Sequence, residues 1–307
     1  MRDSTILPDH HVTDPLLGDG LLTRVRLALG ILGEMPVSVD GLFKLYAAWC
    51  REVPFDNIRK MIDLSGGGRL SGLSAFEFFE NWLEHGTGGT CWPSSNALCT
   101  LLRSLGFDAR RVAGSMYDLG MINHGTVKVR IDGEDWLADT CMLTHRPVPV
   151  NGEFFVDNSN EARIEVEPVE HSHVIWYDFV PSPVYVPCRL STDPVDAALY
   201  EERYEVFSRE YSPFNDRLYF RTGGPDGASV ILGNVRFRRT DDGMEIHEFT
   251  RDGLCEHLTS LGASADIIER WINAGGLERS FDPANIRQAP EITGIRPSLR
   301  QGGEGLE

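Results

Sequence analysis

The chain has 307 residues, of which 46 are acidic and 29 are lysine or arginine, giving a formal net charge of −17. A field of this sign repels nucleic acid and anionic membranes, so we expect neither as a partner. Six widely spaced cysteines without a CxxC pair favour free thiols in a reducing cytoplasm and no metal site. The first residues lack the apolar core of a signal peptide, and no stretch is long enough to span a membrane.

The N-terminal third has the pattern of a helical domain. After an expected flexible segment over residues 1–19, apolar residues recur with helical spacing over 21–32, 39–49 and 74–83. Ser74 is placed to cap the third of these helices. A further helix follows Cys91, with apolar residues at 97, 98, 101, 102 and 105 and a glycine at 106. We therefore predict a helical domain over 20–110.

Cys91 follows the turn Thr87-Gly88-Gly89-Thr90, which places it at or just before the first turn of that helix. Unpaired amides and the helix dipole lower the pKa of a thiol at this position and can stabilise an oxyanion. The alternative is a small buried side chain, as most free cysteines are. The double glycine and two candidate partners downstream favour the reactive thiol.

Short strands are predicted from 111 to 195, namely over 111–114, 124–131, 136–139, 162–166 and 173–177. Asp132-Gly133 is a strong two-residue hairpin turn. The resulting register puts His124 opposite Cys141 and Asp139 two residues along the same face, within side-chain reach. Cys91, His124 and Asp139 would then supply the nucleophile, base and orienting carboxylate of a catalytic triad.

In the last third of the chain, predicted helices and strands alternate. We predict an α/β lid domain over 196–282 with a helix over 195–208, strands over 229–237 and 244–249, and helices over 252–261 and 264–273, the last capped by Ser264. Prolines and glycines predict a loop-like tail over 283–307. The expected fold is α+β: an N-terminal helical bundle, a central antiparallel β-sheet or barrel and a C-terminal α/β lid. This order also resembles a cysteine-peptidase core.

Four segments resemble the arylamine N-acetyltransferase family, and the similarity covers roughly residues 20 to 275. They are Val53-Pro54-Phe55-Asp56-Asn57-Ile58, the Gly-Gly-Thr-Cys turn, His124 with Asp139, and Ser212-Pro213-Phe214-Asn215-Asp216-Arg217-Leu218. By position, Cys91, His124 and Asp139 match that family's triad. The resemblance implies an acyltransferase that moves an acyl group from an acyl-CoA or acyl-carrier-protein thioester, through a cysteine acyl-enzyme, to a small-molecule amine. It implies no tightly bound cofactor.

The chain departs from the family pattern around the nucleophile. Thr87 and Pro93 stand where the family has an arginine and a glutamate, and the Cys91-Trp92 pair resembles transglutaminases. After Asp139 the sequence Thr140-Cys141-Met142-Leu143 replaces the family's Val-Gly-Phe-Gly. We therefore favour a specialised amide synthase. The alternatives are an arylamine N-acetyltransferase that uses acetyl-CoA, a transglutaminase-like or peptidase-like enzyme with an amide donor, and a binding protein without chemistry.

Overall fold

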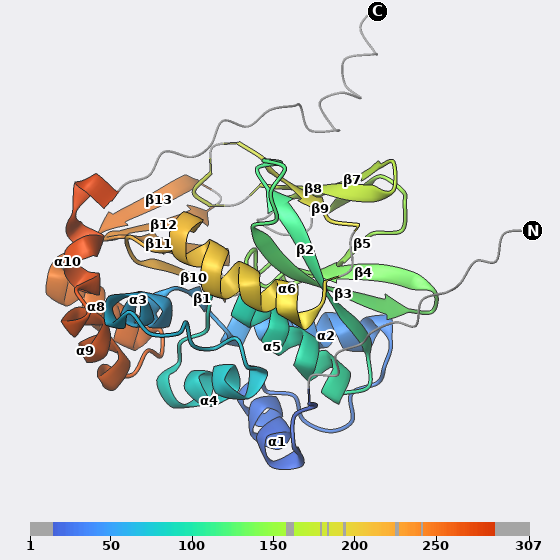
Figure 1. The fold of residues 1–307 in the computed structure, drawn as a ribbon, viewed down its shortest axis with the longest axis horizontal. Helices are drawn as coiled ribbons and strands as arrows, with labels where there is room; N and C mark the ends of the chain where they lie inside the picture. The colour runs from blue at the N-terminus through green and yellow to red at the C-terminus, as the bar shows by residue number, and fades with distance from the viewer. Residues whose placement is uncertain are drawn as a thin grey trace, which may run out of the picture.

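The computed structural model describes residues 15–157, 163–178, 180–182, 184–192, 195–224, 227–240 and 242–285. Two antiparallel sheets lie against the N-terminal helices, and a helical segment crosses one face of the molecule (Figure 1). This is the α+β class expected from the sequence. Residues 1–14 and 286–307, which hold most of the expected flexible segment and tail, lie outside the described residues.

The N-terminal part of the described chain contains α1 (Asp19–Ala28), α2 (Val39–Glu52), α3 (Ile58–Gly66), α4 (Ala75–His85) and α5 (Cys91–Ser104). The α2 helix begins where the Ser38 hydroxyl accepts the amide N–H of Gly41. Ser74 precedes α4 as expected, but its side chain makes no capping hydrogen bond, so that detail of the prediction is wrong. The nine-residue helix α3 was not predicted.

The larger sheet has the strand order β5-β4-β3-β2-β9-β8-β7-β6. The hairpin of β3 and β4 has the expected register, because Ile131 pairs with Glu134 across a turn in which Asp132 and Gly133 both have positive φ. The strands are β2 (Asp108–Met116), β3 (His124–Ile131), β4 (Glu134–Ala138), β5 (Val148–Pro149), β6 (Phe155–Asp157), β7 (Ile164–Val169), β8 (Ser172–Tyr177) and β9 (Val186–Leu190).

The smaller sheet, β1-β10-β11-β12-β13, corrects one prediction. The single strand expected over 229–237 is two strands, because the chain turns at Gly233, where φ is +62°, and Leu232 pairs with Val235. Glycine adopts this left-handed conformation without steric cost. The strands are β1 (Phe55–Asp56), β10 (Tyr219–Gly224), β11 (Gly227–Leu232), β12 (Val235–Thr240) and β13 (Gly243–Glu248).

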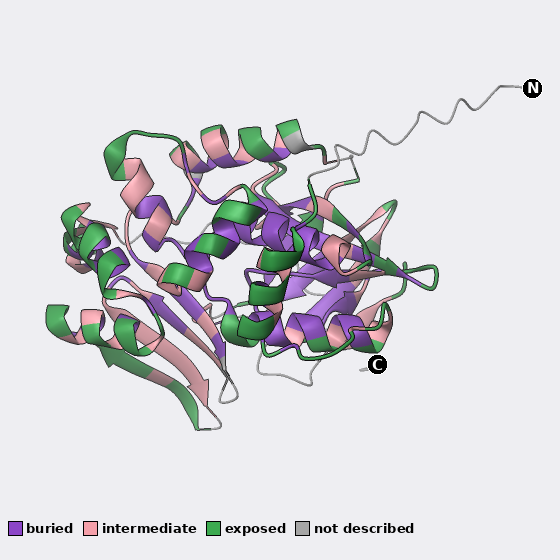
Figure 2. Cartoon of the chain, turned by 90° about the horizontal axis from the view of Figure 1, so that it is seen from below, coloured by how far each residue is buried: buried purple, intermediate pink, exposed green. Residues whose placement is uncertain are grey.

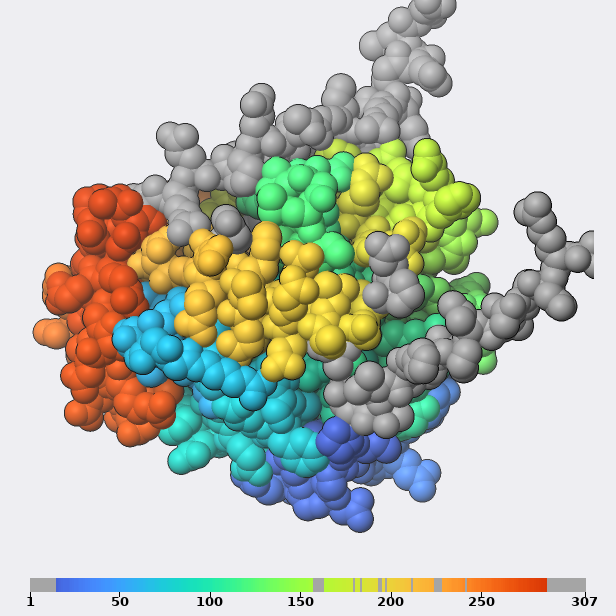
Figure 3. All heavy atoms as spheres, viewed as in Figure 1, coloured from blue at the N-terminus to red at the C-terminus, as the bar shows by residue number. Residues whose placement is uncertain are grey.

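The segment between the sheets is more broken than the helix expected over 195–208. It consists of α6 (Ala197–Glu202), a π-helical stretch (Arg203–Phe207) and α7 (Ser208–Tyr211), and it forms a ridge across the face seen in Figure 3. After the smaller sheet come α8 (Arg251–Ser260), α9 (Ala265–Asn273), α10 (Gly276–Phe281) and a 3₁₀ turn (Pro283–Asn285). Ser264 caps α9 as predicted, since its hydroxyl accepts the amide N–H of Ile267.

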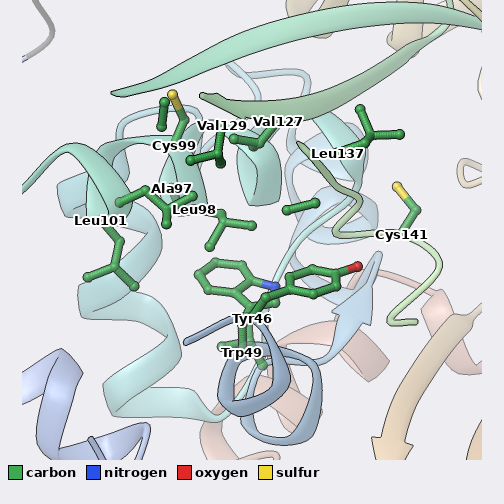
Figure 4. Packing of buried hydrophobic residues seen from close by; sticks show 14 of the residues in the cluster. Tyr46, Trp49, Ala97, Leu98, Cys99, Leu101, Val127, Val129, Leu137 and Cys141 are labelled. Carbon is green, nitrogen blue, oxygen red and sulfur yellow. The ribbon is translucent and has the colours of Figure 1, made fainter. Parts of the chain in front are cut away.

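Buried residues gather in the middle of the molecule (Figure 2), where α5 packs against β2 and β3 of the larger sheet. Tyr46 and Trp49 of α2 face Leu98 of α5, and Val127 and Val129 of β3 cover the same cluster from the sheet (Figure 4). A second, smaller cluster joins α3 to the helices that follow the smaller sheet. The helix that begins at Cys91 is therefore fixed by the main core along its length.

Candidate active site

Cys91 is the first residue of α5, as the sequence predicted, and its side chain is buried. The glycine turn before it is held by β1: the Gly88 amide donates to Asp56 Oδ2 at 2.6 Å, and the Gly89 carbonyl accepts the Asp56 amide at 3.3 Å. A Cβ on Gly88 would lie 1.9 Å from the carbonyl oxygen of Pro54, so only glycine allows this approach. The Pro-Phe-Asp segment therefore positions the thiol.

His124 and Asp139 meet across the β3–β4 hairpin. His124 Nε2 lies 2.6 Å from Asp139 Oδ2, and both residues are 3% exposed. The other carboxylate oxygen of Asp139 accepts the backbone amides of Cys141 at 2.8 Å and Met142 at 3.1 Å. With Nε2 engaged by Asp139, Nδ1 is the ring nitrogen on the side of the thiols and the one that can exchange a proton with a reacting group.

The ionisation of these groups favours a thiolate and an imidazolium. A hydrogen bond from the Cys141 thiol holds the pKa of Cys91 well below its usual range, against the opposing effect of burial and with further help from His124. Burial alone would lower the pKa of His124, but the Asp139 carboxylate outweighs it and raises the pKa to about 10. Burial likewise opposes ionisation of Asp139, yet the His124 ring lowers its pKa. The buried charges thus stabilise one another.

Cys141 is a site residue that the sequence placed correctly but did not identify as functional. Its Sγ lies 3.8 Å from His124 Nδ1, and the ligand atoms of Cys91, His124 and Cys141 all lie within 4.8 Å of one another. Two thiols and an imidazole at this spacing are also donors that a soft metal ion accepts. The signal in the sequence was the expected hairpin register, which placed position 141 opposite His124; in the structure the ladder ends at Val127 and Ala138, and Cys141 lies in the turn that follows.

Two further residues that sequence reasoning missed hold the chain beyond Asp139. The Tyr46 hydroxyl donates to the Asp139 carbonyl at 2.5 Å. Arg221 of β10, only 1% exposed, donates to the Cys141 carbonyl and to the Val180 carbonyl, each at 2.9 Å. The Tyr46–Asp139, Arg221–Cys141 and Arg221–Val180 contacts join residues 93, 80 and 41 apart in the sequence, separations that no local pattern reveals.

Gly125 closes the site from the sheet side. Its backbone N–H interacts with the Cys91 sulfur and lowers the thiol's pKa. A Cβ at this position would lie 2.6 Å from Tyr200 Oη and 2.7 Å from Trp92 Cε3, whose ring stacks edge-on against Tyr200. Glycine is therefore required for the amide to approach the sulfur.

A cavity of about 220 Å³ also opens beside Tyr200, on the side of α5 lined by Asn96 and Thr100. Arg69 and Arg111 also line it. Cys91, His124 and Asp139 are not among its lining residues.

The sequence model of the N-acetyltransferase family matches residues 38–263. Arylamine N-acetyltransferase of Mycolicibacterium smegmatis is 26% identical over 274 residues, covering 84% of this chain and 91% of that protein. Proansamycin X synthase of Amycolatopsis mediterranei (strain S699) is 28% identical over 116 residues, covering 36% of this chain and 44% of the synthase, so less than half of that relative is matched.

Solved structures show the same fold. The arylamine N-acetyltransferase from M. tuberculosis has a TM-score of 0.72 at 18% identity and covers 85% of this chain and 100% of its own. The Mycobacterium marinum arylamine N-acetyltransferase in complex with CoA has a TM-score of 0.69 at 18% identity and covers 84% and 96%. Fold and sequence together define an acyltransferase. The chain belongs to the N-acetyltransferase family, whose model matches most of its length, and this confirms the resemblance seen in the sequence.

Proposed function

We propose that the protein is a cysteine-dependent amide synthase, in which Cys91, His124 and Asp139 transfer an acyl group from a thioester to an amine. The observation that carries the proposal is the Cys91 thiol at the start of α5, beside a His124–Asp139 pair joined at 2.6 Å. A buried thiolate next to an imidazolium is the nucleophile and acid that thioester cleavage needs.

In the first step the Cys91 thiolate attacks the thioester carbonyl and forms a tetrahedral oxyanion. The Gly125 amide and the free amides at the start of α5 are donors near this charge. The carbon–sulfur bond of the donor then breaks, and the departing thiolate takes a proton from His124 Nδ1. The acyl group remains on Cys91, and His124 is neutral.

In the second step the amine attacks the acyl carbon, and His124 Nδ1 accepts the proton that the nitrogen loses. Collapse of the tetrahedral intermediate forms the amide and expels the Cys91 thiolate, which restores the ion pair. Asp139 keeps the imidazole oriented through Nε2 in both steps. No tightly bound cofactor is needed, since the thioester supplies the free energy.

The segment that follows Asp139, residues 140–143, supports a donor other than acetyl-CoA. Cys141, Met142 and Leu143 are all buried there, where the sequence departs from the family pattern, and Arg221 fixes the Cys141 carbonyl. A relative of this chain is named a synthase rather than an acetyltransferase. We place a larger acyl chain, carried by CoA or a carrier protein, in this site, with a small-molecule amine as acceptor.

We also place the enzyme in the cytoplasm. All six cysteines are free in the structure, which suits a reducing compartment. No helix among the described residues has the length and apolar character needed to cross a membrane.

The test is intact mass spectrometry after incubation with a panel of acyl-CoA and acyl-pantetheine thioesters. We expect a mass gain equal to one acyl group, absent from Cys91→Ala and retained by Cys99→Ala, a buried cysteine further along the same helix. Acylation by long acyl groups with little by acetyl supports the synthase; preference for acetyl-CoA with an arylamine acceptor identifies an arylamine N-acetyltransferase. No adduct with any thioester overturns the proposal in favour of an amide donor.

A further inference from the structure

A second thiol lies beside the nucleophile in this site. The sulfurs of Cys141 and Cys91 are within 4.8 Å of each other, and both side chains are buried, at 6% and 5% exposure. Amide synthesis as described above uses Cys91 alone as nucleophile. Cys141 enters that reaction only through the hydrogen bond that it donates to Cys91, so its own reactivity is not used there.

The two thiols differ in ionisation. Cys91 has a lowered pKa because it accepts a hydrogen bond from Cys141 and contacts His124, whereas burial and the neighbouring thiolate raise the pKa of Cys141 well above its usual range. A peroxide reacts with a thiolate and not with a thiol. Oxidation therefore begins at Cys91, with a protonated thiol waiting next to the oxidised sulfur.

The backbone of Cys141 is held on both sides. Its amide donates to Asp139 Oδ1 at 2.8 Å, and its carbonyl accepts Arg221 at 2.9 Å. Closing a disulfide requires the two sulfurs, which already lie within 4.8 Å of each other, to approach to about 2.05 Å.

We propose that Cys91 and Cys141 form a reversible disulfide when a peroxide oxidises the nucleophile. The Cys91 thiolate and one proton react with hydrogen peroxide to give a sulfenic acid and water. The Cys141 sulfur then attacks the sulfenic sulfur, and the hydroxyl leaves as a second water with the proton of the Cys141 thiol. A reductant dithiol reverses the bond. The disulfide shields Cys91 from irreversible oxidation to sulfinic acid.

The experiment treats the full-length protein with a slight excess of hydrogen peroxide, in chelator to exclude soft metals, and then alkylates the remaining thiols. Intact mass and peptide mapping follow. For the wild type we expect a loss of two hydrogens, a linked peptide pair containing Cys91 and Cys141, and recovery of most acylation activity after reduction. The Cys141→Ser variant replaces the thiol by a hydroxyl of similar volume. We expect it to gain two oxygens at Cys91 on peroxide treatment and to remain inactive in acylation after reduction.

Cys255→Ser is the matched control, because Cys255 lies on α8 outside the main core and should leave both the bond and the recovery unchanged. Overoxidation of the wild type as fast as Cys141→Ser, or a disulfide joining other cysteines, would overturn the proposal. The peptide map of the oxidised wild type shows whether Cys91 and Cys141 are linked, and this result does not depend on how well a variant folds. If the reduced enzyme is not acylated by any thioester but peroxide still forms the Cys91–Cys141 disulfide, amide synthesis is refuted and the disulfide proposal stands. The two proposals can therefore be refuted independently.

Discussion

Asp139 is the residue on which the charge of the site depends. Its carboxylate contacts the His124 ring, and an asparagine keeps its size while removing the charge. We expect Asp139→Asn to reduce the rate of Cys91 acylation on the order of 10³- to 10⁴-fold, as loss of the orienting carboxylate does in other triads. Rapid-quench mass spectrometry of a single turnover measures this rate.

The matched control for that variant is Asp135→Asn, on the same hairpin. Asp135 pairs with Lys128 at 2.9 Å, both side chains are partly exposed, and loss of the Asp135 charge should leave acylation within about twofold. An equal loss of rate in both variants would mean that hairpin stability, and not the charge of Asp139, sets the rate.

Cys91 should also show its ionisation directly. Because its pKa lies well below that of a free thiol, the thiolate persists as pH falls, and alkylation by iodoacetamide at pH 7 should remain close to its value at pH 9. His124→Ala removes a group that lowers this pKa, so the alkylation rate at pH 7 should fall several-fold relative to pH 9. A parallel pH profile in both proteins would contradict the ion pair.

Among the elements, the β3–β4 hairpin positions His124 and Asp139, and at Gly125 it packs tightly against Tyr200 and Trp92. Gly125→Ala would place a methyl group 2.6 Å from the Tyr200 hydroxyl, and we expect it to lower the free energy of unfolding by about 1–3 kcal/mol and to slow acylation. Gly20→Ala in α1, where nothing lies within 4 Å, should raise the same free energy by up to about 1 kcal/mol. Urea titration measures both, and a neutral Gly125→Ala would show that Trp92 and Tyr200 shift freely.

Local patterns predicted the elements that build the site, and contacts distant in sequence escaped them. The start of α5 follows from a glycine turn and a helical repeat, and the hairpin register follows from Asp132-Gly133, so Cys91, His124 and Asp139 could be placed together. The apolar run over 229–237 concealed a turn because Gly233 lies between two strands of similar composition. The role of Arg221 depends on β10 meeting the chain beyond Asp139, and nothing near Arg221 in the sequence indicates that meeting.

In the molecule as a whole, Asp56 joins the helical part to the smaller sheet. Burial raises its pKa to about 7, against the amides of Gly88 and Ile58 that oppose the shift. The folded state therefore holds a proton that the unfolded chain releases near pH 4, and this contribution to stability is lost as pH rises from about 4 through 7. Asp56→Asn should flatten the decline in unfolding free energy across that window.

Chemical denaturation at several pH values measures the effect as the difference between wild type and variant. Asp40→Asn, on the exposed first turn of α2, is the control and should keep the slope of the wild type. If Asp56→Asn shows that same slope, the carboxyl is already ionised at low pH and burial does not govern it.

Trp271 holds the last helices to the rest of the molecule. It is fully buried in the second core cluster, and its indole N–H points to the Met61 sulfur of α3 at 3.4 Å. We expect Trp271→Ala to cost about 3–5 kcal/mol of stability, and Ile272→Ala, next in sequence and 38% exposed, less than about 1 kcal/mol. Thermal unfolding distinguishes them, and similar losses would place the stability of α9 outside this cluster.

Strand β10 has a further consequence for the order in which the enzyme is made. It pairs with β1, which holds the glycine turn of Cys91, and its Arg221 fixes the carbonyl of Cys141. A nascent chain that ends before β10 lacks both supports, although Cys91, His124 and Asp139 precede β10 in the sequence. We therefore expect the arrangement of Cys91, His124 and Asp139 to be completed late in synthesis, after β10 has paired with β1.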